Sequence, residues 1–235
     1  MKFSVVIPVF NEAGSIGALQ ERLHEVMRKT SAEYEIIYVD DASNDSSPDI
    51  LKGLTQRFAE TRLISFKQNR GQSTALYAGF RAANGEWIIT LDADGQNPPE
   101  EIPHLLEFCD KCDFVTGIRE KRNDNVARKF SSIVARSVRR MVLGDTTTDT
   151  GCSLRIFRRE IIESLPFFRN FHRFFPFLVK TMGFSIKEVG VAHNKRTSGE
   201  SKYGIWKRLK EGIFDLWGVF WLNRRLIKYE VKHED

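Results

Sequence analysis

The sequence predicts an α/β protein with a mostly parallel sheet flanked by helices. Short apolar runs alternate with segments of helical periodicity along the first half of the chain, as in successive β-α-β units. The clearest run, Trp87–Leu91, is continuous enough to indicate a strand buried on both faces. It ends in Asp92-Ala93-Asp94, so two carboxylates follow a buried strand, and open α/β sheets bind their ligands at that edge.

The predicted elements follow one another in a regular order. Strands are expected at 3–8, 35–39, 63–66, 87–91 and 114–116. Helices are expected at 15–27, 47–58, 71–83 and 102–108. Ser47-Pro48 is typical of a helix start, and the small residues of 71–83 allow close packing on a sheet. This alternation favours right-handed crossovers and parallel strands.

Length and composition limit the class of protein. At 235 residues the chain forms one large domain or a domain with an appendage, and 41% apolar with 29% charged residues is typical of a soluble globular protein. Three cysteines suit a reducing compartment. The apolar start, residues 3–7, is too short for a signal peptide, and no run approaches the roughly 20 apolar residues of a membrane-spanning helix. We therefore expect a cytoplasmic protein.

The net charge of +5 is unevenly distributed. Residues 119–140 carry eight Lys or Arg against two acidic residues, and residues 195–228 carry nine against three, so the rest of the chain is acidic. Two basic segments on an acidic body indicate an anionic partner, which is a phosphate group, a nucleic acid or a membrane surface. The alternative for each segment is a solvated helix face.

Acidic residues follow three of the predicted strands. Glu12 comes after the first, Asp40 and Asp41 end the second, and Asp92 and Asp94 end the fourth. Neighbouring carboxylates repel each other unless a cation lies between them, and oxygen ligands favour Mg²⁺ or Mn²⁺. The alternative is a pair of solvated acids that cap the next helix. No glycine-rich phosphate-binding motif follows the first strand, so the acids favour a nucleotide-sugar site in which a metal neutralises the diphosphate.

Five segments carry a resemblance to a known family. In chain order they are residues 6–12 (VIPVFNE), 39–45 (VDDASND), 69–76 (NRGQSTAL), 91–100 (LDADGQNPPE) and 196–203 (RTSGESKY). With this order and spacing, the chain resembles the inverting GT-A glycosyltransferases of the dolichyl-phosphate mannose synthase and bacterial polyprenyl-phosphate glycosyltransferase type. The resemblance covers roughly residues 3–210 and implies a Rossmann-like GT-A fold.

The resemblance also implies roles for individual residues. It assigns the nucleotide-sugar pocket to Pro8, Phe10, Glu12, Asp40, Asp41 and Gln72, and the metal and diphosphate site to Asp92, Asp94 and Gln96. It assigns the acceptor phosphate to Arg119, Arg128 and Ser132, and the loop that closes on the donor to Arg196 and Lys202. Asp149 matches a segment that lines the same site. Phe10 stands where many relatives have tyrosine, so the pocket loses one hydroxyl.

The expected reaction follows from these residue types. Displacement of a nucleoside diphosphate requires positive charge at the leaving group, which Mg²⁺ or Mn²⁺ with Arg196 or Lys202 would supply. A lipid phosphate, with a second pKa of about 6, is largely anionic at pH 7, so no strong general base is needed. The resemblance implies a metal-dependent hexosyltransferase that moves a sugar from GDP-mannose or a UDP-sugar to dolichyl or undecaprenyl phosphate, with inversion. Asp92, Asp94 and Asp149 complete the expected catalytic set.

The last third of the chain combines aromatic and basic residues. Six phenylalanines lie within residues 167–177. Two interpretations fit them, which are packing in the core and an apolar surface beside a lipid tail. The aromatic run 212–222 has Lys and Arg on both sides, and as a helix it would extend about 16 Å, too short to span a bilayer. We expect residues 1–204 to form the catalytic domain, and residues 205–235 an amphipathic tail on the cytoplasmic face of a membrane.

Three other functions fit parts of the sequence. A glycosyltransferase of the same fold acting on a glycan or protein would need a catalytic base, and the acceptor-phosphate residues would lose their purpose. A sugar nucleotidyltransferase should have a glycine-rich loop after the first strand. A basic module that binds membranes or nucleic acid explains the charge but not Asp40, Asp92 and Asp94. We therefore expect a nucleotide-sugar donor, a polyprenyl-phosphate acceptor and a membrane surface as partners, and no nucleic acid.

Overall fold

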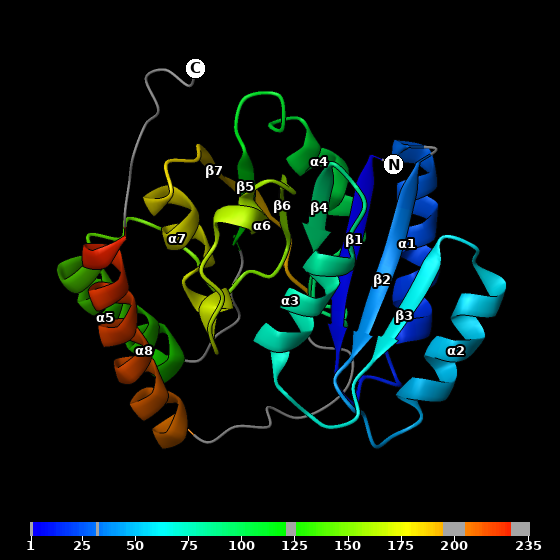
Figure 1. Cartoon of the computed structure of the whole chain (residues 1–235), viewed down its shortest axis with the longest axis horizontal. Coiled ribbons are helices and arrows are strands. Elements are labelled where there is room, and N and C mark those ends of the chain that lie inside the picture. The colour runs from blue at the N-terminus through cyan, green and yellow to red at the C-terminus, as the bar shows by residue number, and fades with distance from the viewer. Residues whose placement is uncertain (1, 32, 121–125, 195–204, 227–235) are drawn as a thin grey trace, which may run out of the picture.

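The protein folds as a seven-stranded sheet with helices on both faces (Figure 1). The computed structural model describes residues 2–31, 33–120, 126–194 and 205–226, and its side chains are described outside 126–133 and 205–211. The strands are β1 (Phe3–Val9), β2 (Tyr34–Asp40), β3 (Thr61–Ser65), β4 (Trp87–Thr90), β5 (Phe114–Arg119), β6 (Arg155–Arg158) and β7 (Ile186–Val191). The helices are α1 (Ile16–Thr30), α2 (Ser47–Arg57), α3 (Gln72–Ala82), α4 (Ile102–Leu106), α5 (Val126–Leu143), α6 (Ile161–Ser164), α7 (Phe175–Thr181) and α8 (Ile205–Arg225). Two short 3₁₀ helices are η1 (Pro99–Glu101) and η2 (Phe171–Arg173).

The sheet is mostly parallel, with the strand order β3-β2-β1-β4-β6-β5-β7. Strand β6 lies antiparallel between β4 and β5, and the other neighbouring strands are parallel. All five strands that the sequence predicts are present, so the predicted α/β class is confirmed. The sequence did not predict β6 and β7, because both are short runs in which charged residues interrupt the apolar pattern.

The centre of the sheet is apolar on both faces because helices cover both. Along β1, Val5, Val6 and Ile7 are all fully buried. Val5 and Ile7 pack in a core that includes residues of α1, α2 and α4, whereas Val6 packs in a second core with α3, α6 and α7. A Cβ atom on Gly79 of α3 would lie 2.3 Å from Val6 Cγ1, so only glycine permits this close approach of helix and strand.

The phenylalanine-rich segment is largely core. Phe171, Phe174, Phe175 and Phe177 are buried in the second core, and Phe167 and Phe168 pack half-buried against it. The core interpretation is therefore correct for the four buried rings. None of the four is available as a surface for a lipid tail.

Helix α8 packs on the rest of the protein and beside α5 (Figure 1). Val219 is buried in the second core, where Leu216 and Phe220 pack half-buried. Asp215 accepts a hydrogen bond from Asn170 Nδ2 (2.9 Å) and lies 3.9 Å from Arg173 Nη1. The predicted C-terminal amphipathic helix is thus present, and the domain boundary at residue 204 stays a prediction. No helix in the described ranges has the length and apolar character that a bilayer crossing requires.

Glu35 of β2 links this strand to its neighbours β1 and β3. Its Oε1 accepts hydrogen bonds from Ser4 Oγ (2.7 Å) and the Asn84 amide (2.8 Å), and its Oε2 pairs with Arg62. Burial alone would raise the pKa of Glu35, but the hydrogen bonds from Asn84, Ser4 and Arg62 bring it below its usual value. Since the folded pKa is depressed, this contribution to stability is present above the unfolded pKa, and it is lost as pH falls through the folded pKa.

We expect Glu35→Gln to lower the free energy of unfolding at pH 7 by about 1.5–3 kcal/mol, because a buried charge-assisted network is removed. The difference from the wild type should shrink as the pH falls through the depressed folded pKa of Glu35, because the wild-type carboxyl is then itself protonated. Urea unfolding at a series of decreasing pH values, starting from pH 7, measures this change. The exposed Glu163→Gln is the matched control and should change stability little throughout the series. A deficit for Glu35→Gln that stays as large at the lowest pH at which both proteins fold as it is at pH 7 would contradict the ionic role.

Candidate active site

The candidate site lies at the carboxyl ends of β1, β2 and β4, which are neighbours in the sheet. After β4 the chain turns sharply through Asp92–Asn97, with Gly95 at a positive φ of 74°. The Gln96 amide donates to Asp94 Oδ1 (3.0 Å) and fixes that carboxyl within the turn. Asp94 is buried and Asp92 is partly exposed. The segment Asp92–Asn97, which we call the acidic turn, therefore holds both predicted carboxylates and Gln96 at one edge of the sheet.

The electrostatics of the acidic turn fit a divalent cation. The partial burial of Asp92, with the charge of Asp94, raises the pKa of Asp92 to about 6. A cation beside the two carboxylates would remove this repulsion. The described residues contain no group of three or more His, Cys, Asp or Glu side chains placed to hold a metal. Asp92 and Asp94 would therefore leave part of the coordination sphere to Gln96, water and phosphate, which is usual for Mg²⁺.

Asp41 shapes the loop that brings α3 to the acidic turn. Its carboxylate accepts hydrogen bonds from the backbone amides of Arg70 (2.6 Å) and Gly71 (2.8 Å), and Gly71 has a positive φ of 88°. Helix α3 then begins at Gln72, whose Nε2 donates to Asp92 Oδ1 (2.9 Å). Gln72 thus contacts the acidic turn directly, and Asp41 acts on it through the loop that it holds.

The other residues predicted to bind the donor lie at the ends of β1 and β2. Pro8 is within β1 and Phe10 follows the strand directly. Asp40 ends β2 and is buried. Glu12 is also buried, and it lies close enough to Asp92 for its charge to raise the pKa of Asp92. The structure therefore brings these four residues to the same edge of the sheet as the acidic turn.

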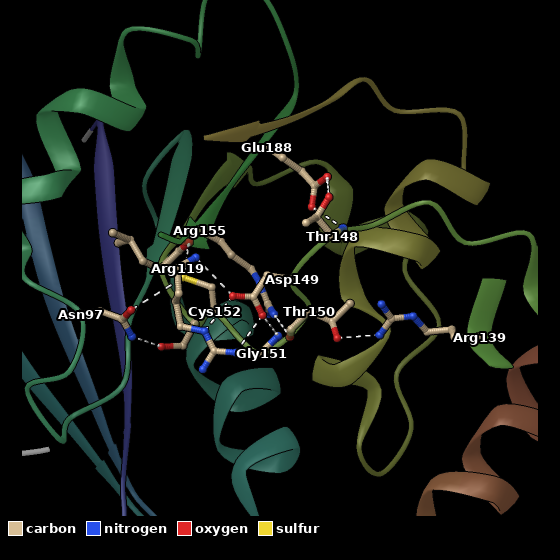
Figure 2. A network of polar contacts seen from close by, with 12 residues as sticks. Asn97, Arg119, Arg139, Thr148, Asp149, Thr150, Gly151, Cys152, Arg155 and Glu188 are labelled. Carbon is tan, nitrogen blue, oxygen red and sulfur yellow. Dashed lines mark hydrogen bonds and ion pairs between the residues drawn. The ribbon is translucent and has the colours of Figure 1, made fainter. Parts of the chain in front are cut away.

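Arg119 and Asp149 form a partly buried ion pair (Figure 2). Arg119 ends β5, and its Nε and Nη2 donate to the two oxygens of Asp149 at 2.7 and 2.8 Å. Burial alone would raise the pKa of Asp149, but the hydrogen bonds and charge of Arg119 lower it below its usual value. The Gly151 amide also donates to Asp149 (3.0 Å), and a Cβ atom on Gly151 would lie 2.5 Å from Arg119 Nη2. A larger residue at position 151 would require the Arg119 guanidinium to shift from this position.

Arg155 is a buried cation that the sequence did not predict. It begins β6 opposite Thr90 of β4, and its Nη2 donates to the carbonyl oxygens of Thr150 (3.0 Å) and His172 (3.3 Å). Burial lowers the pKa of Arg155, and the charges of Asp92 and Asp149 act in the opposite direction. Figure 2 shows it beside the Arg119–Asp149 pair. The available signal was an arginine between Leu154 and Ile156 in a run that is otherwise apolar.

Four predicted residues cannot be placed in this way. Arg128 and Ser132 belong to α5, but their side chains lie outside the described residues. Arg196 and Lys202 also lie outside the described residues. Their roles stay predictions from the sequence.

The fold is similar to those of several solved glycosyltransferases. A mannosyltransferase from Pyrobaculum calidifontis in complex with GDP-Man and Mn²⁺ matches with a TM-score of 0.69 and 20% identity, over 97% of this chain and 66% of that one. Glucosyl-3-phosphoglycerate synthase from Mycobacterium tuberculosis, in complex with Mn²⁺, UDP and phosphoglyceric acid, matches with a TM-score of 0.69 and 18% identity, over 97% and 80% of the two chains. The predicted GT-A fold is confirmed.

Curated relatives are more similar in sequence. The undecaprenyl-phosphate 4-deoxy-4-formamido-L-arabinose transferase of Photorhabdus laumondii is 40% identical over 209 residues, which are 88% of this chain and 64% of that protein. The protein of the same name in Serratia proteamaculans is 39% identical over 208 residues, again 88% and 64%. This chain thus spans slightly less than two thirds of the length of these relatives. The profile of the family described as Glycosyl transferase family 2 matches residues 4–165. Since this match covers more than half of the chain, the protein belongs to glycosyl transferase family 2.

Proposed function

We propose that this protein transfers a sugar from a nucleotide donor to undecaprenyl phosphate or a similar polyprenyl phosphate. The observation that carries the proposal is that one short segment contacts both the acidic turn and an arginine: Ser153 accepts a hydrogen bond from the Asp92 amide, and Asp149 pairs with Arg119. We propose that the acidic turn binds a cation and the donor diphosphate, and that Arg119 binds the phosphate of an acceptor. The two curated relatives, whose names state transfer involving undecaprenyl phosphate, support this acceptor.

On the donor side, Asp92 and Asp94 would hold Mg²⁺ or Mn²⁺, which when bound supplies positive charge to the leaving diphosphate. Gln72 keeps the Asp92 carboxyl oriented through its hydrogen bond. Glu12 and Asp40, at the neighbouring strand ends, are placed to accept hydrogen bonds from the base and ribose. Arg196 and Lys202 remain our proposed cations for the donor diphosphate.

On the acceptor side, Arg119 would orient the attacking phosphate, with Arg128 and Ser132 of α5 as further proposed contacts. Asp149 holds the Arg119 guanidinium in place, because both of its oxygens accept hydrogen bonds from that side chain. Its pKa is lowered by this pairing, so we assign Asp149 to positioning rather than to proton removal. An acceptor phosphate that is already anionic needs no base.

The sugar is the open part of the proposal. The hexose expected from the sequence is one candidate, as in GDP-mannose. The curated relatives are named for a substituted pentose, 4-deoxy-4-formamido-L-arabinose, which makes a donor carrying that sugar the second candidate. We propose the pentose first, because these relatives share about 40% of their residues with this chain.

The test is transfer to a short polyprenyl phosphate from a panel of GDP- and UDP-sugars that includes the 4-formamido pentose, followed by mass spectrometry and anomeric analysis of the product. We expect one donor to give a polyprenyl-phosphate sugar with inverted anomeric configuration. Transfer to a glycan or peptide acceptor, with none to polyprenyl phosphate, would overturn the proposal.

Two adjacent helices expose a large apolar face that suits a membrane surface. We define the α5–α8 face by its exposed apolar side chains, which are Val134, Val138, Met141, Ile213, Phe214, Trp217 and Trp221. Met141 is 86% and Phe214 is 83% exposed, so the helix packing leaves these side chains uncovered. Exposed arginines lie on both helices, for example Arg140 and Arg224. Aromatic residues with cations beside them favour the interface of an anionic bilayer. We propose that this face brings the active site to the membrane, whose cytoplasmic side stays the expected one.

Replacing Phe214, Trp217 and Trp221 together by serine should weaken binding to anionic vesicles about ten- to a hundredfold. Each aromatic side chain that enters the interface contributes a fraction of the ~1.5–3 kcal/mol of full burial, so three contribute roughly 1.5–3 kcal/mol. Vesicle sedimentation measures the change, and binding of the wild type should weaken with salt. Phe220 is left in place because it packs half-buried against the second core.

The control is Tyr77→Ser on α3, which removes an exposed aromatic ring outside the α5–α8 face. Transfer to a membrane-embedded acceptor should fall more than transfer to a short acceptor in detergent. A triple variant with the wild-type melting temperature and unchanged vesicle binding would disprove docking through this face.

A further inference from the structure

Ser153 closes the acidic turn at both of its ends. Its Oγ accepts a hydrogen bond from the Asp92 amide (3.0 Å) and another from Asn97 Nδ2 (2.6 Å). The Ser153 hydroxyl also favours the ionised Asp92 carboxyl, in opposition to the burial and the charge of Asp94, which together raise the pKa of Asp92. One side chain from a distant part of the sequence therefore contacts the first and the last residue of the turn.

The backbone around Ser153 is itself fixed. The Ser153 carbonyl accepts a hydrogen bond from Thr90 Oγ1 (2.7 Å), which anchors it to the end of β4. Cys152 Sγ donates to Asn97 Oδ1 at 3.7 Å (Figure 2). Cys152 and Ser153 therefore hold the same buried asparagine. The loop also contains Asp149, which holds Arg119. Ser153 thus joins the segment that positions the acceptor side to the turn that carries the donor side.

The described side-chain hydrogen bonds of Asn97 that can fix the turn are few. It is buried, and the described contacts of its side chain are those with Ser153 and Cys152. Without the Ser153 hydroxyl, the Asp92 amide and the Asn97 amide group would both lose their acceptor. The turn would then be free to change the separation and direction of its two carboxylates, on which the binding of a cation depends.

We propose that Ser153 is a positioning residue that holds Asp92 and Asp94 in the geometry needed to bind a divalent cation and the donor diphosphate. This inference rests on the proposed function, because it assumes that the acidic turn is the cation site. It adds a residue that acts through the acidic turn, by way of the Asp92 backbone amide and the Asn97 side chain. It also predicts that the hydroxyl, and not the size of the side chain, is what the site requires.

The experiment measures Mn²⁺ affinity by electron paramagnetic resonance in the presence of UDP or GDP, without any turnover. Ser153→Ala should bind Mn²⁺ about ten- to a hundredfold more weakly than the wild type, as is usual when a group that orients a metal ligand is removed. Ser153→Thr, which keeps a hydroxyl, should retain most of the affinity. Ser164→Ala on the exposed surface of α6 is the matched control and should leave it unchanged.

A second variant separates positioning from folding. Ser153→Cys keeps a side chain of similar size but lacks the strong acceptor oxygen, so it should show the same loss of Mn²⁺ affinity even if alanine lowers the melting temperature. Wild-type affinity in both the alanine and the cysteine variants would overturn the inference and leave the proposed function standing. If the wild type itself bound no Mn²⁺ with either nucleotide, the cation site would be wrong and both proposals would fall.

Discussion

Replacing Asp94 by asparagine is expected to reduce sugar transfer by at least about a hundredfold while the protein stays folded. The substitution removes one negative charge from the acidic turn and leaves the size of the side chain unchanged. A cation would lose one of its two carboxylates, and the leaving diphosphate would lose the charge that stabilises it. The melting temperature should stay the same or rise, because the charge of Asp94 is one of the causes that raise the pKa of Asp92.

Activity and thermal unfolding, measured side by side, test this expectation. The control is Asp110→Asn, which removes an exposed carboxylate outside the site. A chelator should abolish the activity of the wild type and of the control. Near-normal turnover of Asp94→Asn, or wild-type activity that a chelator leaves intact, would refute the metal site at the acidic turn.

Phe175→Ala should lower the free energy of unfolding by about 3–5 kcal/mol, the largest stability effect that we expect from a single change. The Phe175 ring is fully buried, and its centroid lies 5.0–5.9 Å from those of four other rings, namely Phe80, Phe114, Phe157 and Phe171. Alanine would leave a cavity that these rings cannot fill. Activity should fall as well, because the Arg155 guanidinium carbon lies 5.5 Å from the centre of the same ring.

Urea unfolding at neutral pH gives the stability loss directly. Phe168→Ala is the matched comparison within the same segment, and since its ring is half-buried it should cost only about 1 kcal/mol. If the free energy of unfolding fell by the same small amount in both variants, the phenylalanine-rich segment would not contribute to the core as the structure indicates.

Much of the site could be predicted because its acidic residues lie at the ends of individual strands, which the sequence identifies. A buried strand that ends in acidic residues places them at the ligand-binding edge, and this reasoning locates Asp40, Asp92 and Asp94 correctly from the sequence alone. It also gives the right strands for the central part of the sheet. The sequence could not show that Asp41 is engaged by the backbone of a loop 29 and 30 residues further on, because that contact depends on tertiary structure.

The site residues that the sequence did not predict lie in or just before β6, the strand that is antiparallel to its neighbours. Arg155 and Ser153 reach the site only because β6 enters the sheet in the opposite direction between β4 and β5. A run as short as Arg155–Arg158, with arginine at both ends, has no clear strand periodicity. Arg119 and Asp149 were both recognised, but their pairing depends on the same reversed strand and could not be read from their spacing.

The reversed strand also has a consequence for how the protein is assembled during synthesis. Strands β4 and β5 precede β6 in the chain but do not pair with each other in the folded sheet, so the sheet cannot be continuous until residues 155–158 have been synthesised. Pairings between such distant segments form slowly and close late in folding. Strand β6 begins at Arg155 and directly follows Ser153, so the contacts of Ser153 with the acidic turn become available only when the strand that makes the sheet continuous has been synthesised. A partly made chain therefore has the acidic turn and its contacts with Gln72, but lacks the hydrogen bonds to Ser153.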